Sequence, residues 1–471
     1  MRILLLDPPY EFKEIGGVKQ NFRYVLNKIP SLGLAYLAAV AEKKCHTVKI
    51  VDCTLGLGYQ ETARIAEGFS PQIIGITATT PTFNNAVYLA SILRKILPRA
   101  IFVCGGAHPT ASPCDAMEKG VFDFLVLGEG EETFIELISY LEDKIPSRPD
   151  DISGIAFKRD GKVIITSRRS RINDLDFIPF PARHLLPPLS AYHPTPASYR
   201  KLPLAVIMTS RGCPSYCTFC DRAVFGERFR KRSVSNVIKE VQEVILKYGA
   251  KEIRFFDDAF TLDFSHIEGI CRGMKKLRPC IPWTCLTKVN AVNFDILKMI
   301  RESGCWQVLF GLESGDDAIL KHLGKGNTVK QNKEVVFWAK KVGLSIRADF
   351  LVGSPWETKE SFKKTVEFAK SLPLDFAHFN KFVPYPGTAI YKDLIDKGYK
   401  INFNNGSYTN NHDDFVYIPT SFNELEYCNF LDRAYKEFYL RPGYILRRLL
   451  SLRSLPELIG QAKGLYSILS L

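Results

Sequence analysis

Three cysteines stand close together between residues 209 and 222. Cys213, Cys217 and Cys220 follow one another at intervals of four and three residues. Thiolates at such intervals can converge on one soft centre, as a bound iron–sulfur cluster requires. A local zinc site usually has a fourth Cys or His nearby, and this stretch contains none. A cubane held by three thiolates leaves one iron open to a substrate's amino and carboxylate groups. Three reduced cysteines without metal, or a zinc site completed by a distant ligand, are the alternatives.

The chain around these cysteines has a globular composition. Its 471 residues, 46% of them hydrophobic, predict two or three domains with a sizeable core. The 63 Lys and Arg against 50 Asp and Glu give a net charge of +13, which favours an anionic partner. We expect a cytoplasmic protein, because there is no run of about 18 apolar residues and the N-terminus lacks a basic region and a cleavage site.

Residues 1–145 alternate short apolar runs with amphipathic stretches, which predicts an α/β domain with a doubly wound, Rossmann-like parallel sheet. The expected strands are 2–6, 47–51, 73–76, 101–104 and 124–127. Such sheets bind ligands at the carboxyl ends of their strands. Small or kinked residues there would admit a large planar or phosphate-bearing ligand: Pro8, Pro9, Thr77, Thr79, Gly105, Gly106 and Gly128. Tight loops that simply need Gly and Pro are the alternative.

Three further regions follow. Residues 146–203 predict a linker with a small β element, a hairpin at 154–165. Residues 204–390 predict a full or partial (β/α) TIM-type barrel, whose chemistry lies at the carboxyl ends of its strands. Its expected strands are 205–209, 252–256, 283–286, 306–311, 345–352 and 376–382. Residues 391–471 are helical, and their basic, Leu-rich tail can contact an anionic membrane surface or dock on the protein's own core.

The pattern of Cys213, Cys217, Phe219 and Cys220 after the first barrel strand resembles the radical S-adenosylmethionine (SAM) superfamily. The resemblance implies that the three cysteines bind a [4Fe-4S] cluster whose fourth iron chelates SAM, with Phe219 near the adenine. One-electron reduction would then cleave SAM to methionine and a 5′-deoxyadenosyl radical, which abstracts hydrogen from unactivated carbon. Two nearby arginines would help to hold the negative charge of the cluster: Arg211 and Arg222.

Later strand ends carry residues that the same resemblance assigns to SAM. Asp257 and Asp258 follow the second strand and would accept the SAM ammonium group, unless they are a solvated pair that caps a helix. Glu313 and Ser314 follow the fourth strand and would contact the ribose, with a helix cap at Ser314 as the alternative. Arg347 on the fifth strand could meet the SAM carboxylate as a planar fork.

The order of the domains is similar to the cobalamin-binding branch of this superfamily. The supporting stretches are 7–9, 30–37, 105–110 and 127–131. No D-x-H-x-x-G motif supplies a histidine as lower ligand to cobalt, and Asp7-Pro8-Pro9 occupies the corresponding loop. His108 could replace that histidine or could be a hydrogen-bonding structural residue. A sheet that has lost cobalamin and only shapes the substrate channel is a further alternative.

These features predict a radical SAM enzyme, with methyl transfer from methylcobalamin to an unactivated carbon as the first interpretation. The second is oxidative cyclisation or hydroxylation, resembling the anaerobic magnesium-protoporphyrin monomethyl ester cyclases. A third, from another class, is a nucleic-acid-binding protein with a structural metal, although no basic patch interleaved with aromatics supports it. The expected partners are a small-molecule or lipid-like substrate and an external one-electron donor such as flavodoxin or ferredoxin, without nucleic acid.

Overall fold

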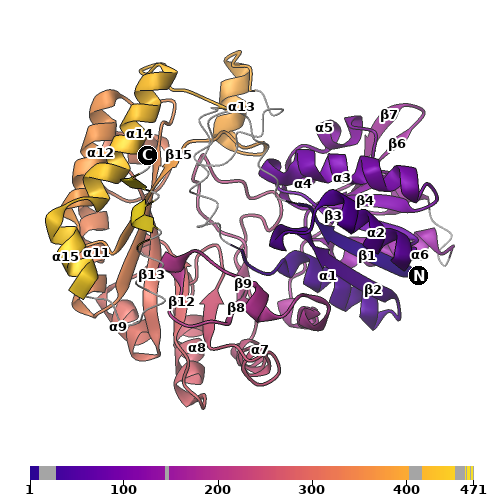
Figure 1. The fold of residues 1–471 in the computed structure, drawn as a ribbon, viewed down its shortest axis with the longest axis horizontal. Helices are drawn as coiled ribbons and strands as arrows, with labels where there is room; N and C mark the ends of the chain where they lie inside the picture. The colour runs from indigo at the N-terminus through magenta and orange to yellow at the C-terminus, as the bar shows by residue number, and fades with distance from the viewer. Residues whose placement is uncertain are drawn as a thin grey trace.

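The structure is a computed structural model that describes residues 1–9, 28–143, 148–401 and 416–450, together with 462, 464–466 and 468–469 of the tail. Two α/β lobes lie side by side, the N-terminal one in indigo and purple and the second in red and orange (Figure 1). Each lobe is built on a sheet whose neighbouring strands are mainly parallel. The two lobes match the predicted order of a Rossmann-like sheet followed by a barrel-like one.

The first sheet has the strand order β2-β1-β3-β4-β5-β6-β7. Its parallel strands are β1 (Arg2–Asp7), β2 (Thr47–Asp52), β3 (Ile73–Thr77), β4 (Ile101–Gly105) and β5 (Phe124–Val126). One face packs on α1 (Leu32–Lys43) and α6 (Gly130–Leu141), and the other on α2 (Tyr59–Phe69), α3 (Phe83–Ile96) and α5 (Pro113–Glu118). In β1, Leu4 and Leu6 face one layer and Leu5 the other, so burial on both faces explains the unbroken apolar run.

Strands β6 (Ile155–Arg159) and β7 (Lys162–Ile165) form the predicted hairpin. Asp160 and Gly161 at its tip both have positive φ, 49° and 75°, as a tight two-residue turn requires. The hairpin does not stand apart in the linker, because β6 pairs antiparallel with β5 and extends the first sheet.

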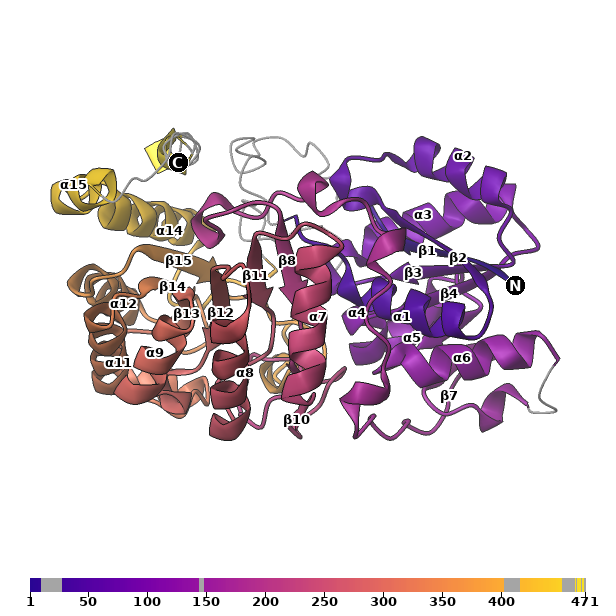
Figure 2. The same cartoon turned by 90° about the horizontal axis from the view of Figure 1, so that it is seen from below.

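The second sheet is parallel, with the strand order β15-β14-β13-β12-β11-β8. Its strands are β8 (Leu204–Ile207), β11 (Glu252–Phe255), β12 (Trp283–Thr287), β13 (Cys305–Glu313), β14 (Ser345–Val352) and β15 (Phe376–Lys381). In the described residues β8 and β15 are the two open edges, so the barrel is a partial one. The outer face is covered by α7 (Val234–Leu246), α8 (Phe264–Lys276), α9 (Phe294–Glu302), α11 (Val329–Lys341) and α12 (Lys359–Ser371) around one apolar core (Figure 2).

Helix α14 (Glu424–Tyr439) protects the edge strand β15 without adding another strand. The hydroxyl of Tyr439 accepts the N–H of Ala377 at 3.0 Å and donates to the carbonyl of the same residue at 2.7 Å. The hydroxyl of Tyr435 does the same at Phe379, with both distances 3.2 Å. The two tyrosines therefore satisfy backbone groups that an open edge would expose.

The last described helix, α15 (Pro442–Leu450), docks on this edge through Tyr444, whose hydroxyl donates to the carbonyl of Asp375 at 2.7 Å. Its outer side carries exposed leucines, Leu446, Leu449 and Leu450. Most of the tail predicted to contact a membrane, including 451–461, lies outside the described residues. None of the helices in the described part of the chain has both the length and the apolar character needed to cross a bilayer.

Candidate active site

A two-stranded sheet closes the base of the cysteine loop. Strand β9 (Ser210–Arg211) pairs antiparallel with β10 (Arg230–Lys231), and the segment between them carries the three cysteines that are predicted to bind a cluster. Gly212 opens this segment with φ +85°, and a Cβ there would overlap the carbonyl oxygen of Arg228. Only glycine fits this position, so the local sequence fixes how the loop leaves the sheet.

The thiols lie in a partly open, positively charged setting. Two of them are half-buried and the third, Cys220, is exposed. Nζ of Lys288 donates to the hydroxyl of Ser215 within the loop. Burial raises the pKa of the Cys217 thiol, whereas the nearby Lys325 and Lys288 oppose that rise. Three thiols on one loop, with two lysines to offset negative charge, fit the ligand set of a [4Fe-4S] cluster.

Arg211 and Arg222, the two arginines beside the cysteines, contact different parts of the structure. Arg211 is buried and pairs with Glu129 and Glu131 of the N-terminal lobe at 2.8 and 2.5 Å. Arg222 stays within the loop, where it donates to the carbonyl of Ser215 at 2.6 Å. The prediction that Arg211 holds cluster charge is wrong, because two carboxylates from another domain neutralise it. The lysines that lie near the thiols are distant in sequence, so no local motif pointed to them.

Asp257 and Asp258 follow β11 but lie in different surroundings. Oδ1 of the buried Asp257 accepts the N–H and the hydroxyl of Thr209, both at 2.9 Å, and also the N–H and hydroxyl of Ser210. Burial raises the pKa of Asp257 to about 6 against these hydrogen bonds. Asp258 is exposed beside the cysteine loop and bonds to the backbone of Gly212. Asp257 thus anchors the strand end before the cysteines, and Asp258 is the carboxylate that faces the loop.

Glu313 and Ser314 also diverge. The buried Glu313, with a left-handed φ of 62°, accepts Nζ of Lys325 at 2.7 Å. That lysine lies 5.9 Å from the ring centroid of Phe219 and near the cluster thiols. The hydroxyl of Ser314 is instead 3.1 Å from that of Thr365 on α12. The structure therefore gathers Glu313 and Phe219 at the cysteine loop and ties Ser314 to the helix behind the sheet.

Arg347 lies on β14, before the end of the strand, in a polar cluster that is separate from the cysteine loop. Its guanidinium lies 3.2 Å from Nδ1 of His378 on β15, and that nitrogen is 3.4 Å from Oδ1 of Asp349. Nε of Arg347 is buried and has no hydrogen-bond partner among the described residues. Burial and the positive charge of Arg347 lower the pKa of Arg254 on β11 to about 10. The charge of Arg347 therefore acts on Arg254, and a guanidinium whose buried Nε has no partner among the described residues can receive an anion.

Four predicted residues at the strand ends of the first sheet line one cavity of about 170 Å³: Thr77, Gly105, Gly106 and Gly128. The opposite wall comes from the second lobe, with Met208, Arg211, Val224 and Phe225. Gly33 and Gly128 both line the cavity, and a Cβ on either would meet no atom within 4 Å. The glycines therefore keep this strand-end cradle open, which fits the close approach of a planar ligand such as cobalamin.

Three predicted residues do not line that cavity. Pro8 and Pro9 are buried after β1, and Thr79 is exposed at the start of a short 3₁₀ turn. The carboxyl directly before the prolines, Asp7, has its pKa raised to about 7 by burial and by the neighbouring charge of Asp52. The end of β1 thus contributes one carboxyl, Asp7, near Asp52 at the end of β2, rather than a histidine.

His108 is engaged at both ring nitrogens. Nδ1 lies 3.3 Å from the hydroxyl of Thr80, and Nε2 lies 3.2 Å from Oδ2 of Asp115. The ring also stacks on Phe83 with centroids 4.0 Å apart. These contacts support the structural role of His108 over a role as cobalt ligand.

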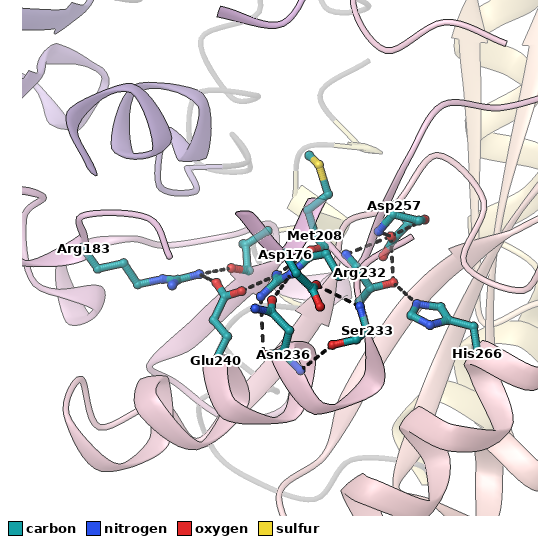
Figure 3. Close-up of polar contacts among 12 residues, drawn as sticks. Asp176, Arg183, Met208, Arg232, Ser233, Asn236, Glu240, Asp257 and His266 are labelled. Atoms are coloured by element: carbon teal, nitrogen blue, oxygen red, sulfur yellow. Dashed lines mark hydrogen bonds and ion pairs between the residues drawn. The ribbon is translucent and has the colours of Figure 1, made fainter. Parts of the chain in front are cut away.

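A buried charged network holds the strand that leads to the cysteines (Figure 3). Glu240 of α7 accepts Arg183 of the linker at 2.5 Å and also accepts Arg232. The same arginines donate to the carbonyls of Val206 and Met208, in and just after β8, at 2.9 and 2.8 Å. The linker therefore fixes the position of β8 and, through it, the start of the cysteine loop.

Two family descriptions match the chain. Residues 207–369 match the Radical SAM superfamily, and residues 20–138 match the B12 binding domain. An uncharacterized methyltransferase of Pyrococcus horikoshii is 38% identical over 450 residues, 95% of this chain and 94% of that protein. Cytidylyl-2-hydroxyethylphosphonate methyltransferase of Streptomyces wedmorensis is 28% identical over 455 residues, 84% of this chain and 82% of that protein.

Solved structures share the fold of both lobes. OxsB, a cobalamin-dependent S-adenosylmethionine radical enzyme with aqua-cobalamin and S-adenosylmethionine bound, aligns with a TM-score of 0.72 at 17% identity, over 99% of this chain and 70% of that one. TsrM of Kitasatospora setae, a radical S-adenosylmethionine methyltransferase, aligns with a TM-score of 0.68 at 16% identity, over 84% of this chain and 75% of that one.

The matched ranges coincide with the two halves of the site, and they define the chain as a radical SAM enzyme. It belongs to the radical SAM superfamily and carries a B12-binding domain in its N-terminal lobe. Its cofactors are a [4Fe-4S] cluster, SAM and cobalamin, which confirms the prediction made from the cysteine spacing and the domain order.

Proposed function

We propose that the enzyme is a cobalamin-dependent methyltransferase that adds a methyl group to an unactivated carbon of a small substrate. The cavity between the lobes carries the proposal. Its walls are the strand-end glycines of the B12-binding domain and, from the second lobe, Arg211, Val224 and Phe225, which flank the cysteine loop in sequence, so the cavity lies between the two lobes that hold the cofactors. The names of the Pyrococcus and Streptomyces relatives, both methyltransferases, support it.

When bound, the cluster and SAM supply a 5′-deoxyadenosyl radical and cobalamin supplies the methyl group. In this proposal Asp258 receives the SAM ammonium group, Phe219 packs on its adenine, and Glu313 together with the backbone at Ser314 contacts its ribose. The ion pair with Lys325 would hold Glu313 in place. The cluster ligands are Cys213, Cys217 and Cys220.

An acidic substrate suits the inner face of the second sheet. Arg347 lies 3.2 Å from His378, whose pKa is lowered by burial and by Arg347, and burial and the charge of Arg347 also lower the pKa of Arg254. This group could hold either the SAM carboxylate or an anionic group of the substrate. The Streptomyces relative is named for a phosphonate, which agrees with a substrate of this class.

Oxidative cyclisation is the second candidate. Proteins named anaerobic magnesium-protoporphyrin IX monomethyl ester cyclase include one from Cereibacter sphaeroides that is 25% identical over 449 residues, 94% of this chain. A glycine-lined cradle would also admit the edge of a planar substrate. The products of SAM distinguish the candidates: S-adenosylhomocysteine with 5′-deoxyadenosine indicates methyl transfer, and 5′-deoxyadenosine alone indicates cyclisation.

The test begins with anaerobic purification and analysis of iron, sulfide and SAM products, with flavodoxin or ferredoxin as electron donor. We expect about four irons per chain and both SAM products. Cys217→Ala should lose the cluster and SAM cleavage, whereas Cys45→Ala, at an exposed cysteine of the other lobe, should change neither. A Cys217→Ala protein that cleaves SAM at the parental rate would overturn the proposal. Contact of the C-terminal tail with lipid remains a prediction.

A further inference from the structure

Four charged side chains are buried at the junction of the two lobes. Arg211 donates to Glu129 at 2.8 Å and to Glu131 at 2.5 Å. Arg230 donates to both carboxylate oxygens of Glu129, at 2.7 and 3.0 Å. None of the four side chains is more than 8% exposed. Two positive and two negative charges therefore balance out of contact with solvent, and the cost of desolvation is met by several hydrogen bonds.

The partners belong to the two places that the cofactors occupy. Glu129 directly follows Gly128 of the glycine cradle, and Glu131 lies in the first turn of α6. Arg211 and Arg230 are the pair that sit opposite each other in the two-stranded sheet at the base of the cysteine loop. Two carboxylates of the B12-binding domain thus accept hydrogen bonds from both strands from which the cysteine loop emerges.

Further contacts restrict the orientation of the two arginines. Arg230 also donates to the carbonyls of Ile172 and Phe225, at 2.6 and 2.9 Å. The guanidinium of Arg211 also lies near the rings of Tyr36 and Phe225, 5.4 and 5.1 Å from their centroids. A planar guanidinium that makes several hydrogen bonds and lies close to aromatic rings has little freedom to rotate. The contact therefore fixes orientation as well as distance.

We propose that Glu129, Glu131, Arg211 and Arg230 are positioning residues that set the separation between the cluster and cobalamin. Glu129, Glu131 and Arg211 also border the cavity between the lobes, and all four act through the elements they join. A misplacement of about 1 Å can cost roughly 100-fold in rate when two groups must meet at one carbon. A network that served folding alone would not need to join the cradle to both strands at the base of the loop.

The test measures the separation itself. Glu131→Gln removes one charge with little change of volume, and Arg230→Lys keeps the charge but loses the fork that reaches Glu129 and two carbonyls. Arg94→Gln is the control, since Arg94 pairs with Asp123 inside the N-terminal lobe at 2.8 Å. Each protein is reconstituted anaerobically with cluster and cob(II)alamin, and the magnetic dipolar interaction between cobalt and the reduced cluster is measured by pulsed paramagnetic resonance.

We expect the parent and Arg94→Gln to give one narrow distance. Glu131→Gln and Arg230→Lys should bind both cofactors in full and lose that single distance in favour of a broad distribution. The inference is overturned if both variants keep the parental distance, or if both fail to hold either cofactor, because the network would then serve folding alone. The readout needs no substrate and no methylated product, so failure of the proposed methyl transfer would leave it intact.

Discussion

Residues that are adjacent in sequence at the strand ends of this site have different roles, because their side chains lie in different surroundings. Asp257 is buried and accepts four hydrogen bonds from Thr209 and Ser210, whereas Asp258 is exposed beside the cysteine loop. Glu313 and Ser314 are both buried, but Glu313 pairs with Lys325 near the cysteine loop and Ser314 contacts Thr365 on α12. At the residue scale, chemistry therefore depends on which of two neighbours points toward the cluster.

The aspartate pair gives a direct test of that division. Asp257→Ala should destabilise the protein by roughly 2–4 kcal/mol, because two buried backbone N–H groups and two hydroxyls lose their hydrogen-bond acceptor. Asp258→Asn should leave stability nearly unchanged and weaken SAM binding several-fold. Urea unfolding and SAM titration measure the two effects. Equal loss of stability in both variants would contradict the assignment.

The buried carboxyl of Glu357 predicts that the stability of the protein depends on pH. Burial raises its pKa from 4.5 to about 7, and one carboxylate oxygen has no hydrogen-bond partner among the described residues. Between pH 4.5 and about 7 the unfolded chain releases this proton while the folded chain keeps it, so stability falls as pH rises. Glu357→Gln should flatten that fall by at most about 3.5 kcal/mol, from about 1.4 kcal/mol per pKa unit. Urea unfolding from about pH 5 to 8 measures it, and the exposed Glu360→Gln, which should keep the parental slope, is the control.

At the scale of elements, a short connection decides whether a strand end can hold a ligand. The turn after β4 passes through Gly106 at φ 108° and ψ −166°, a region open essentially to glycine alone. A Cβ there would lie 2.7 Å from the carbonyl oxygen of Ala78. The backbone segments that directly follow β3 and β4 are thus too close together for a side chain at position 106, and this close approach shapes the strand-end cradle.

A glycine pair tests the cradle. Gly106→Ala should cost roughly 3 kcal/mol, because it adds a clash with backbone to an unfavourable conformation. Gly128→Ala, also at positive φ but without a neighbour within 4 Å, should cost about 1 kcal/mol and reduce cobalamin affinity by occupying the cavity. Urea unfolding and cobalamin titration separate the two. Similar stability losses would show that close packing at Gly106 is unimportant.

For the whole molecule, buried charges join parts of the chain that are far apart in sequence. Arg183 of the linker, Glu240 of α7 and Arg232 after the cysteine loop form one such contact. Glu240→Gln should destabilise by roughly 3–5 kcal/mol, because two buried arginines lose the carboxylate that they share. Glu243→Gln, one turn along the same helix and paired with exposed Lys247, should have little effect. Equal unfolding midpoints for the two variants in urea would show that the linker contact is not structural.

Local sequence predicted the cysteines as cluster ligands, and it determined the two α/β sheets, the hairpin and the order of a Rossmann-like sheet before a barrel-like one. Spacing and periodicity act over a few residues, so the intervals of Cys213, Cys217 and Cys220 indicated a soft metal centre, and their resemblance to a family motif predicted a [4Fe-4S] cluster. Only the tertiary structure decided that Arg211 faces Glu129 and Glu131, that Lys325 lies near the thiols, and that β8 and β15 remain open edges. The physical reason is that charge pairing and cavity shape depend on side chains brought together from distant segments, and periodicity carries no information about such pairs.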